Sequence, residues 1–217
     1  MATRFGWRVR TSLQLAALCL SIDQRATASE QADGLTVRIS IENPDHAFEK
    51  DLLRARKIAE ELYRQADVSL VWVDREQASS DAEALRVVVE PSSAVSRHLG
   101  AEAMGVAPSP GDGTRGSLAY VFSDRVVAFA ASYHLSMASV LGCALAHEIG
   151  HLLLPVNAHA GGGIMRATWT PDLYAPRSPG LPGLEPQQAK LMRTRLMSRG
   201  GPAILSPGAT PSSDWRP

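Results

Sequence analysis

Two histidines and a glutamate stand at a spacing that metal chemistry uses. His147, Glu148 and His151 form the pattern H-E-x-x-H at the start of the stretch HEIGHLLLPVNAHAGGGIM. On a helix, residues four apart lie on one face, so the two imidazoles can bind a single ion. In this pattern the histidines bind zinc and the glutamate is the general base. The three residues therefore predict a hydrolase in which zinc lowers the pKa of a water molecule and Glu148 takes its proton.

A catalytic zinc site usually has three protein ligands and one open position. His159 is the leading candidate for the third ligand, because it follows His151 by eight residues on a glycine-rich loop that must turn. Glu185, at the start of a later helix, is one rival. Asn157 is another, although a neutral amide oxygen is a poor zinc ligand. The expected ligands of one catalytic Zn²⁺ are His147, His151 and His159.

This stretch resembles the signature of the metzincin zinc proteases, H-E-x-x-H-x-x-G-x-x-H followed by a methionine turn. It is most similar to small secreted bacterial metzincin-like proteins that carry HEIGHLLL, then Asn-x-His and then GIM. Two positions depart from the signature, since Leu154 replaces its glycine and Asn157 its third histidine. Pro155 can end the helix in place of that glycine, and the loop to His159 is then two residues longer.

The resemblance covers residues 35–198 and implies both a fold and an activity. The fold would be a single metzincin-like zincin domain of α+β class, with a mixed twisted sheet, a long active-site helix, a methionine turn and a C-terminal helix. The activity would be that of a zinc metalloendopeptidase acting on a peptide or protein substrate. Met165 would lie beneath the zinc ligands, and the segment SLAYVF (117–122) would be the sheet edge that pairs with substrate.

Two other functions remain open on the same scaffold. A non-catalytic secreted binding protein would hold a structural zinc and need a fourth ligand, for which Cys143 is the nearest candidate. A small buried residue is the commoner role for such a cysteine. A zinc hydrolase of a non-peptide amide would use the same water-activating chemistry. Tyr133 and Tyr174 are weaker candidates, by resemblance, for stabilising an oxyanion.

Composition limits the class of protein. The chain has 217 residues, of which 45% are hydrophobic and 20% charged, as in a globular domain. Lys and Arg together number 22, and so do Asp and Glu, so no net charge attracts nucleic acid or an acidic membrane surface. We therefore expect one domain and no nucleic-acid partner.

The first residues have the pattern of a secretory signal peptide. Three arginines precede the apolar run TSLQLAALCLSI, and an Ala-x-Ala site ends at Ala28. The run is too short to anchor the chain stably in a membrane. The pattern predicts a signal peptide over 1–28, cleavage after Ala28, and a secreted or periplasmic domain over 29–199 that is followed by a flexible tail over 200–217.

Periodicity predicts the elements that position the site. Alternating or continuous apolar residues predict strands, and apolar residues three or four apart predict helices. Strands are expected over 34–43, 68–74, 85–90, 116–124 and 125–132, and a loop over 91–116. Helices are expected over 49–66, from Ser136 to Leu154, and from Glu185 to about residue 197.

Overall fold

The computed structural model describes residues 35–95, 100, 102–109, 116–155, 158–174 and 183–200, with only the backbone of residues 172, 173, 199 and 200. The predicted signal peptide lies outside the described residues, as does all of the predicted tail except its first residue. In the described part of the chain, no helix is long and apolar enough to cross a membrane.

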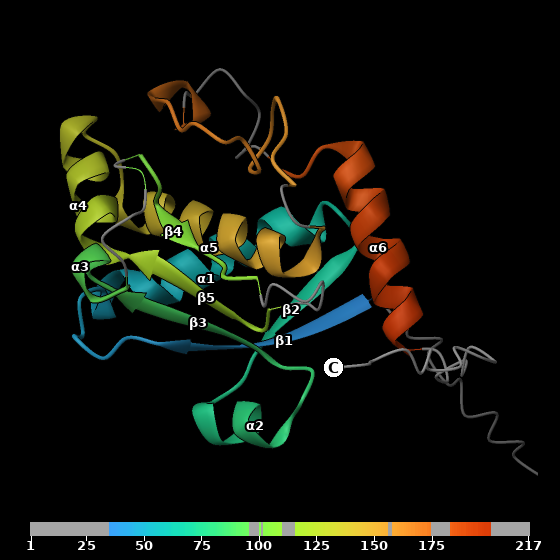
Figure 1. Ribbon diagram of the computed structural model, residues 1–217. Coiled ribbons are helices and arrows are strands. Elements are labelled where there is room, and N and C mark those ends of the chain that lie inside the picture. Colours follow the sequence, from blue (N-terminus) through green and yellow to red (C-terminus); the bar gives the residue numbers. More distant parts are fainter. Residues whose placement is uncertain are drawn as a thin grey trace, which may run out of the picture. The chain divides into compact units, whose positions relative to one another are not determined.

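Five strands form one mixed sheet, which with the helices confirms the predicted α+β class. They are β1 (Leu35–Glu42), β2 (Val68–Trp72), β3 (Leu85–Glu90), β4 (Gly105–Val106) and β5 (Leu118–Phe122). Their order across the sheet is β2-β1-β3-β5-β4 (Figure 1). Four strands are parallel, and β4 alone pairs antiparallel, with β5.

Seven helical segments connect or follow these strands in the described part of the chain, and the strand order decides on which face of the sheet α1 and α2 lie. They are α1 (Glu49–Arg64), α2 (Arg75–Ser80), α3 (Ser92–Val95), α4 (Ser123–Ser132), α5 (Met137–Leu153), the short 3₁₀ turn η1 (Pro171–Tyr174) and α6 (Pro186–Gly200). The steps β1 to β2 and β2 to β3 run in opposite directions across the sheet. Because such crossovers are right-handed, α1 and α2 lie on opposite faces of the sheet (Figure 1).

Helices α1 and α5 pack closely together and form the centre of the core. Gly142 on α5 permits this, because a Cβ there would lie 2.7 Å from Cγ2 of Ile58 and 2.8 Å from the carbonyl oxygen of Ala55. Tyr63 on α1 is fully buried and donates a 2.9 Å hydrogen bond to the carbonyl of Ala146. Helix α1 thus contacts the helix that carries the H-E-x-x-H pattern at both Gly142 and Ala146.

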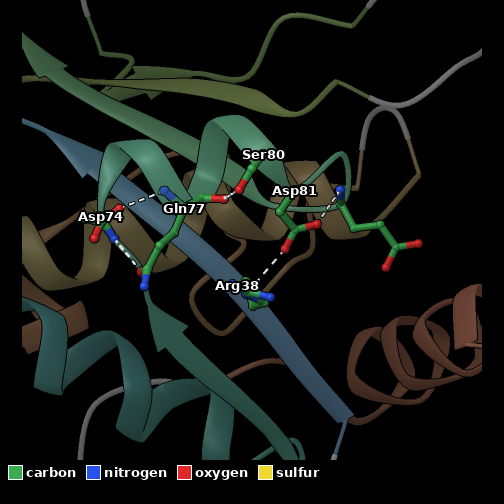
Figure 2. Close-up of polar contacts among 6 residues, drawn as sticks. Arg38, Asp74, Gln77, Ser80 and Asp81 are labelled. Carbon is green, nitrogen blue, oxygen red and sulfur yellow. Dashed lines mark hydrogen bonds and ion pairs between the residues drawn. The ribbon is translucent and has the colours of Figure 1, made fainter.

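The connection from β2 to β3 is shaped by local hydrogen bonds, which Figure 2 shows. Asp74 and Gln77 form a capping box: the Asp74 side chain accepts from the Gln77 amide at 2.7 Å, and the Gln77 side chain accepts from the Asp74 amide at 3.2 Å. Ser80 donates to the Gln77 carbonyl at 2.9 Å, and Arg38 on β1 pairs with Asp81 at 3.3 Å. Helix α2 is therefore specified by its caps, a signal that the apolar periodicity did not include.

The predicted strand over 125–132 is wrong, because this segment lies in helix α4. Its run of apolar residues contains β-branched valines and suits either a short strand or a buried helix. Val126 and Ala130, four apart, are both buried, whereas Val127 is exposed, which is the spacing of one helix face.

The predicted sheet edge is also wrong. SLAYVF contains β5, but β5 has β3 on one side and β4 on the other, so the edge strand is β4. The stretch 91–116, predicted as a loop, contains both α3 and β4. A strand of two residues is too short to show a period in the sequence, and only its pairing with Tyr120 and Val121 defines it.

Candidate metal centre

Helix α5 brings two histidines together, as the sequence predicted. The helix runs from Met137 to Leu153 and ends just before Pro155, which cannot continue it. His147 and His151 lie one turn apart, and their Nε2 atoms are 3.0 Å from each other. His147 is 7% exposed, and its ring meets that of His151 edge-on at a centroid distance of 4.7 Å.

His159 completes a group of three. Its ring centroid is 5.5 Å from that of His147 and 4.8 Å from that of His151. One nitrogen from each ring lies within 4.8 Å of the other two. Among the described residues this is the one group of three or more histidine, cysteine or acidic side chains that could hold a metal ion.

The rival third ligands are not part of this group. The Glu185 side chain lies against the backbone of the glycine turn, where a Cβ on Gly162 would be 2.9 Å from its Oε1. Asn157 lies outside the described residues. The arrangement therefore favours His159 as the third metal ligand over Glu185.

The tautomer of His147 is set by a backbone carbonyl. Its Nδ1 donates a 2.8 Å hydrogen bond to the oxygen of Ile164, which leaves the Nε2 lone pair directed at the other two histidines. Burial lowers the pKa of His147 to about 4 and that of His151 to about 3, so both rings are neutral at pH 7. Neutral imidazoles with free lone pairs are the form that binds a transition metal.

The turn that carries His159 is held by the start of α6. The amide of Ile164 donates to the carbonyl of Gly183 at 2.9 Å, and Nε2 of Gln188 donates to the carbonyl of Ala158 at 2.7 Å. Gly163 has φ +66°, a left-handed conformation that glycine adopts without strain. These hydrogen bonds thus tie one end of the histidine-bearing turn to α6 and the other end to Gly183, just before that helix.

Met165 packs against helix α5 next to His151. It is fully buried, and its sulfur lies against Gly150, the residue just before His151. A side chain at position 150 would collide with it, which gives the glycine in the middle of helix α5 a packing role. The turn after His159 therefore returns to helix α5, where the Met165 side chain fills the space beside Gly150.

Glu148 is buried beside the histidines and has a free oxygen. It is 2% exposed, and its Oε2 has no hydrogen-bond partner. Burial raises the pKa of Glu148 to about 8. Gly105 on β4 lies directly over the carboxylate, since a Cβ there would be 2.7 Å from Oε1. No sequence pattern pointed to Gly105, because its contact with α5 exists only after the sheet has formed.

A cleft of about 470 Å³ opens over these side chains. Three stretches line it, namely the edge segment 102–109, helix α5 and the turn after it. Two further residues complete the lining, Gly116 before β5 and Arg195 on α6. The lining includes His147, Glu148, His151, His159, Trp169 and Arg195. Trp169 lies in the lining, and its ring centroid is 5.7 Å from that of His147.

Cys143, Tyr133 and Tyr174 do not line the cleft. Cys143 is fully buried, burial raises the pKa of its thiol to about 12, and its sulfur faces the hydroxyl of Tyr174. Burial also raises the pKa of Tyr174 above its usual range. Neither Tyr174 nor Tyr133 lines the cleft, and Tyr133 is 46% exposed at the end of α4. The structure therefore gives no support to an oxyanion role for either tyrosine.

The donor set suits a zinc ion. Three imidazoles converge from one side, one of them with its tautomer fixed by a carbonyl, and the described residues add no fourth cysteine or acidic side chain to the group. Zinc is commonly bound by three histidines at catalytic sites, with one position left for water or substrate. No protein-family model matches the chain, and a search of curated proteins finds no match to it either.

Proposed function

We propose that this protein is a zinc-dependent endopeptidase of metzincin type. The observation that carries the proposal is the buried carboxylate of Glu148, which has an oxygen without a hydrogen-bond partner and belongs to a residue that lines the same cleft as the three-histidine group. A buried acid without a partner is costly to a fold, and such groups concentrate at active sites. A structural role for the histidines in the core would not explain why a buried, unpaired carboxylate stands beside them, and neither would a metal site at the surface.

Each residue has a separate role in this proposal. His147, His151 and His159 would hold the metal, with His147 oriented by Ile164. Zinc in this position would act as a Lewis acid that lowers the pKa of a water molecule and polarises a carbonyl. Glu148 would take the proton of the attacking water and pass it to the leaving amine. A cation beside Glu148 would favour its ionised form, against the effect of burial.

The edge strand supports a peptide as substrate. β4 is the last strand of the sheet, and Gly105 and Val106 line the cleft beside Glu148. An extended peptide can add to an exposed sheet edge through main-chain hydrogen bonds. This favours a peptide over a small non-peptide amide, which would have no use for such an edge.

The position of Cys143 weighs against a closed, structural zinc site. Such a site needs a fourth ligand. Cys143 was the nearest candidate in the sequence, but it packs against Tyr174 and is absent from the histidine group.

We also propose that the protein is secreted or exported to the periplasm after cleavage at Ala28, which rests on the sequence pattern alone.

The decisive experiment compares Glu148→Gln with the parent chain. We expect one zinc per chain in both by elemental analysis, and a loss of peptide cleavage of about 10³-fold or more in the variant, because the general base is gone. Glu83→Gln is the matched control, since Glu83 is exposed between α2 and β3. Undiminished cleavage by Glu148→Gln, or a parent that binds no zinc, would rule the proposal out.

A further inference from the structure

Arg195 is a cleft residue with no part in the proposed zinc chemistry. It is half-buried on α6 and lines the same cleft as His151 and His159. Within the described part of the chain, no carboxylate lies within ion-pair distance of its guanidinium. A guanidinium that lines a cleft without a counter-ion is available to bind an anion, because its five N–H donors match a carboxylate.

The helix that carries Arg195 offers it no internal partner. The sequence of α6, PQQAKLMRTRLMSRG, contains four cationic residues and no acidic one. The residues one turn away from Arg195 are Leu191, Met192, Ser198 and Arg199. Arg193, by contrast, is used in the fold, because it donates to the carbonyl of Ala66 at 3.0 Å and lies 3.6 Å from a carboxylate oxygen of Asp67.

The helix dipole does not account for Arg195 either. Cations are favoured in the last turn of a helix, and the effect decays within that turn. Helix α6 ends at Gly200, so Arg195 stands before its last turn.

The other ionisable side chains in the cleft leave Arg195 free for a ligand. Apart from the histidines, they are Glu148, which is buried beside Gly105, and Glu102, which is exposed before β4. Neither forms an ion pair with Arg195. The rest of the lining is mostly apolar or small, with Leu152, Leu154 and Pro155 among its members, so the guanidinium is its one fixed cation within the described residues.

We propose that Arg195 binds a carboxylate of the peptide substrate, either an acidic side chain or the free C-terminus of a short peptide. The inference rests on the proposed peptidase function and names the class of substrate for it. Guanidinium and carboxylate match in a paired geometry, and such charge-assisted bonds are the strongest polar contacts that a cleft can offer. The protein would then select acidic peptides, or cut near a carboxyl terminus.

Cleavage kinetics give the first test. A neutral peptide that the parent cuts is remade with Glu or Gln at each position around the cut bond, and with a free or amidated C-terminus. We expect one position, or the free terminus, to raise kcat/KM by about tenfold, as one charged hydrogen-bonded pair would. Arg195→Gln should bring that ratio close to one, and Arg195→Lys should keep part of it. Lys190→Gln, which removes an exposed charge from the same helix, should leave it unchanged.

Binding measurements separate the two proposals. Glu148→Gln loaded with zinc is titrated into the same fluorescein-labelled peptides, and their affinities are read by anisotropy. Tighter binding of the carboxylate-bearing peptide, lost when Arg195→Gln is added, supports the role of Arg195 even if no peptide is ever cleaved. Equal affinities for the Glu and Gln peptides and for the acid and amide peptides, or a preference that survives Arg195→Gln, would overturn it. Failure of cleavage alone would count only against the peptidase proposal.

Discussion

Nδ1 of His147 and the carbonyl oxygen of Ile164 are joined by a 2.8 Å hydrogen bond across 17 residues of sequence. The amide of the same residue, Ile164, donates a 2.9 Å hydrogen bond to the carbonyl of Gly183. The backbone of one residue therefore connects a helix, a turn and the segment that leads into α6. Its effect is to present the Nε2 of a neutral histidine to the other two rings, which is how partners of metal-binding histidines act.

His159 should be required for zinc binding. The structure places its ring with those of His147 and His151, so His159→Ala leaves only two imidazoles. We expect zinc affinity to fall by more than about 100-fold, because losing a ligand costs more than losing a ligand's hydrogen-bond partner. Competition with a chromogenic chelator measures it. Glu185→Ala is the comparison, and a larger loss in that variant would show that the assignment of the third ligand is wrong.

Gln188 should contribute to zinc affinity without touching the metal. Its Nε2 donates to the carbonyl of Ala158, the residue before His159, and so holds the turn in place. Gln188→Ala should weaken zinc binding by about tenfold, the lower range for residues that orient metal ligands. Gln187→Ala is exposed on the same helix and serves as the control. Equal zinc affinities for the two variants would mean that the turn keeps its shape without this bond.

Gly105 should be needed for the position of Glu148. A Cβ at this position would lie 2.7 Å from the Glu148 carboxylate oxygen and would also collide with the backbone of β5. Gly105→Ala should lower kcat by about 100-fold through displacement of the base, while zinc content stays the same. Gly100→Ala is the control, because nothing lies within 4 Å of a Cβ there. An active Gly105→Ala variant would show that the two elements can move apart at no cost to catalysis.

Cys143 should be unreactive in the folded protein at any ordinary pH. Burial raises the pKa of its thiol to about 12, so below that pH the thiol keeps its proton, and the side chain is also inaccessible. Alkylation by iodoacetamide should therefore stay slow from pH 7 to pH 9, and should become fast only after unfolding in urea. Because Cys143 is not part of the histidine group, Cys143→Ala should also retain zinc. Rapid labelling of the native protein, or loss of zinc in the variant, would place the thiol at the metal after all.

Two features of the site can be predicted from the sequence because they are local. The four-residue spacing of His147 and His151 has one geometric meaning on a helix, and Pro155 marks where that helix must end. His159 follows within a loop too short to carry it far away. The alternation and runs of apolar residues likewise predict β1, β2, β3 and β5, since a strand or helix period is written in neighbouring residues.

Other features depend on residues that meet only in the folded chain. The two-residue strand β4 has no period of its own and exists through its pairing with β5, so the edge of the sheet was predicted one strand too early. In the same way, the apolar run of α4 suits a strand or a helix until packing selects one face.

The sequence by itself determined the chemistry that this protein can attempt, because residue types and short spacings specify donors and a base. The tertiary structure alone decided what surrounds them. Three spatial relationships join segments that are at least 30 residues apart in the sequence. They are Gly105 against Glu148, Gln188 against Ala158 in the turn that carries His159, and Arg195 in the same cleft as His159. The physical reason is that such contacts follow from the pairing of strands and the packing of helices, which no local pattern of side chains records.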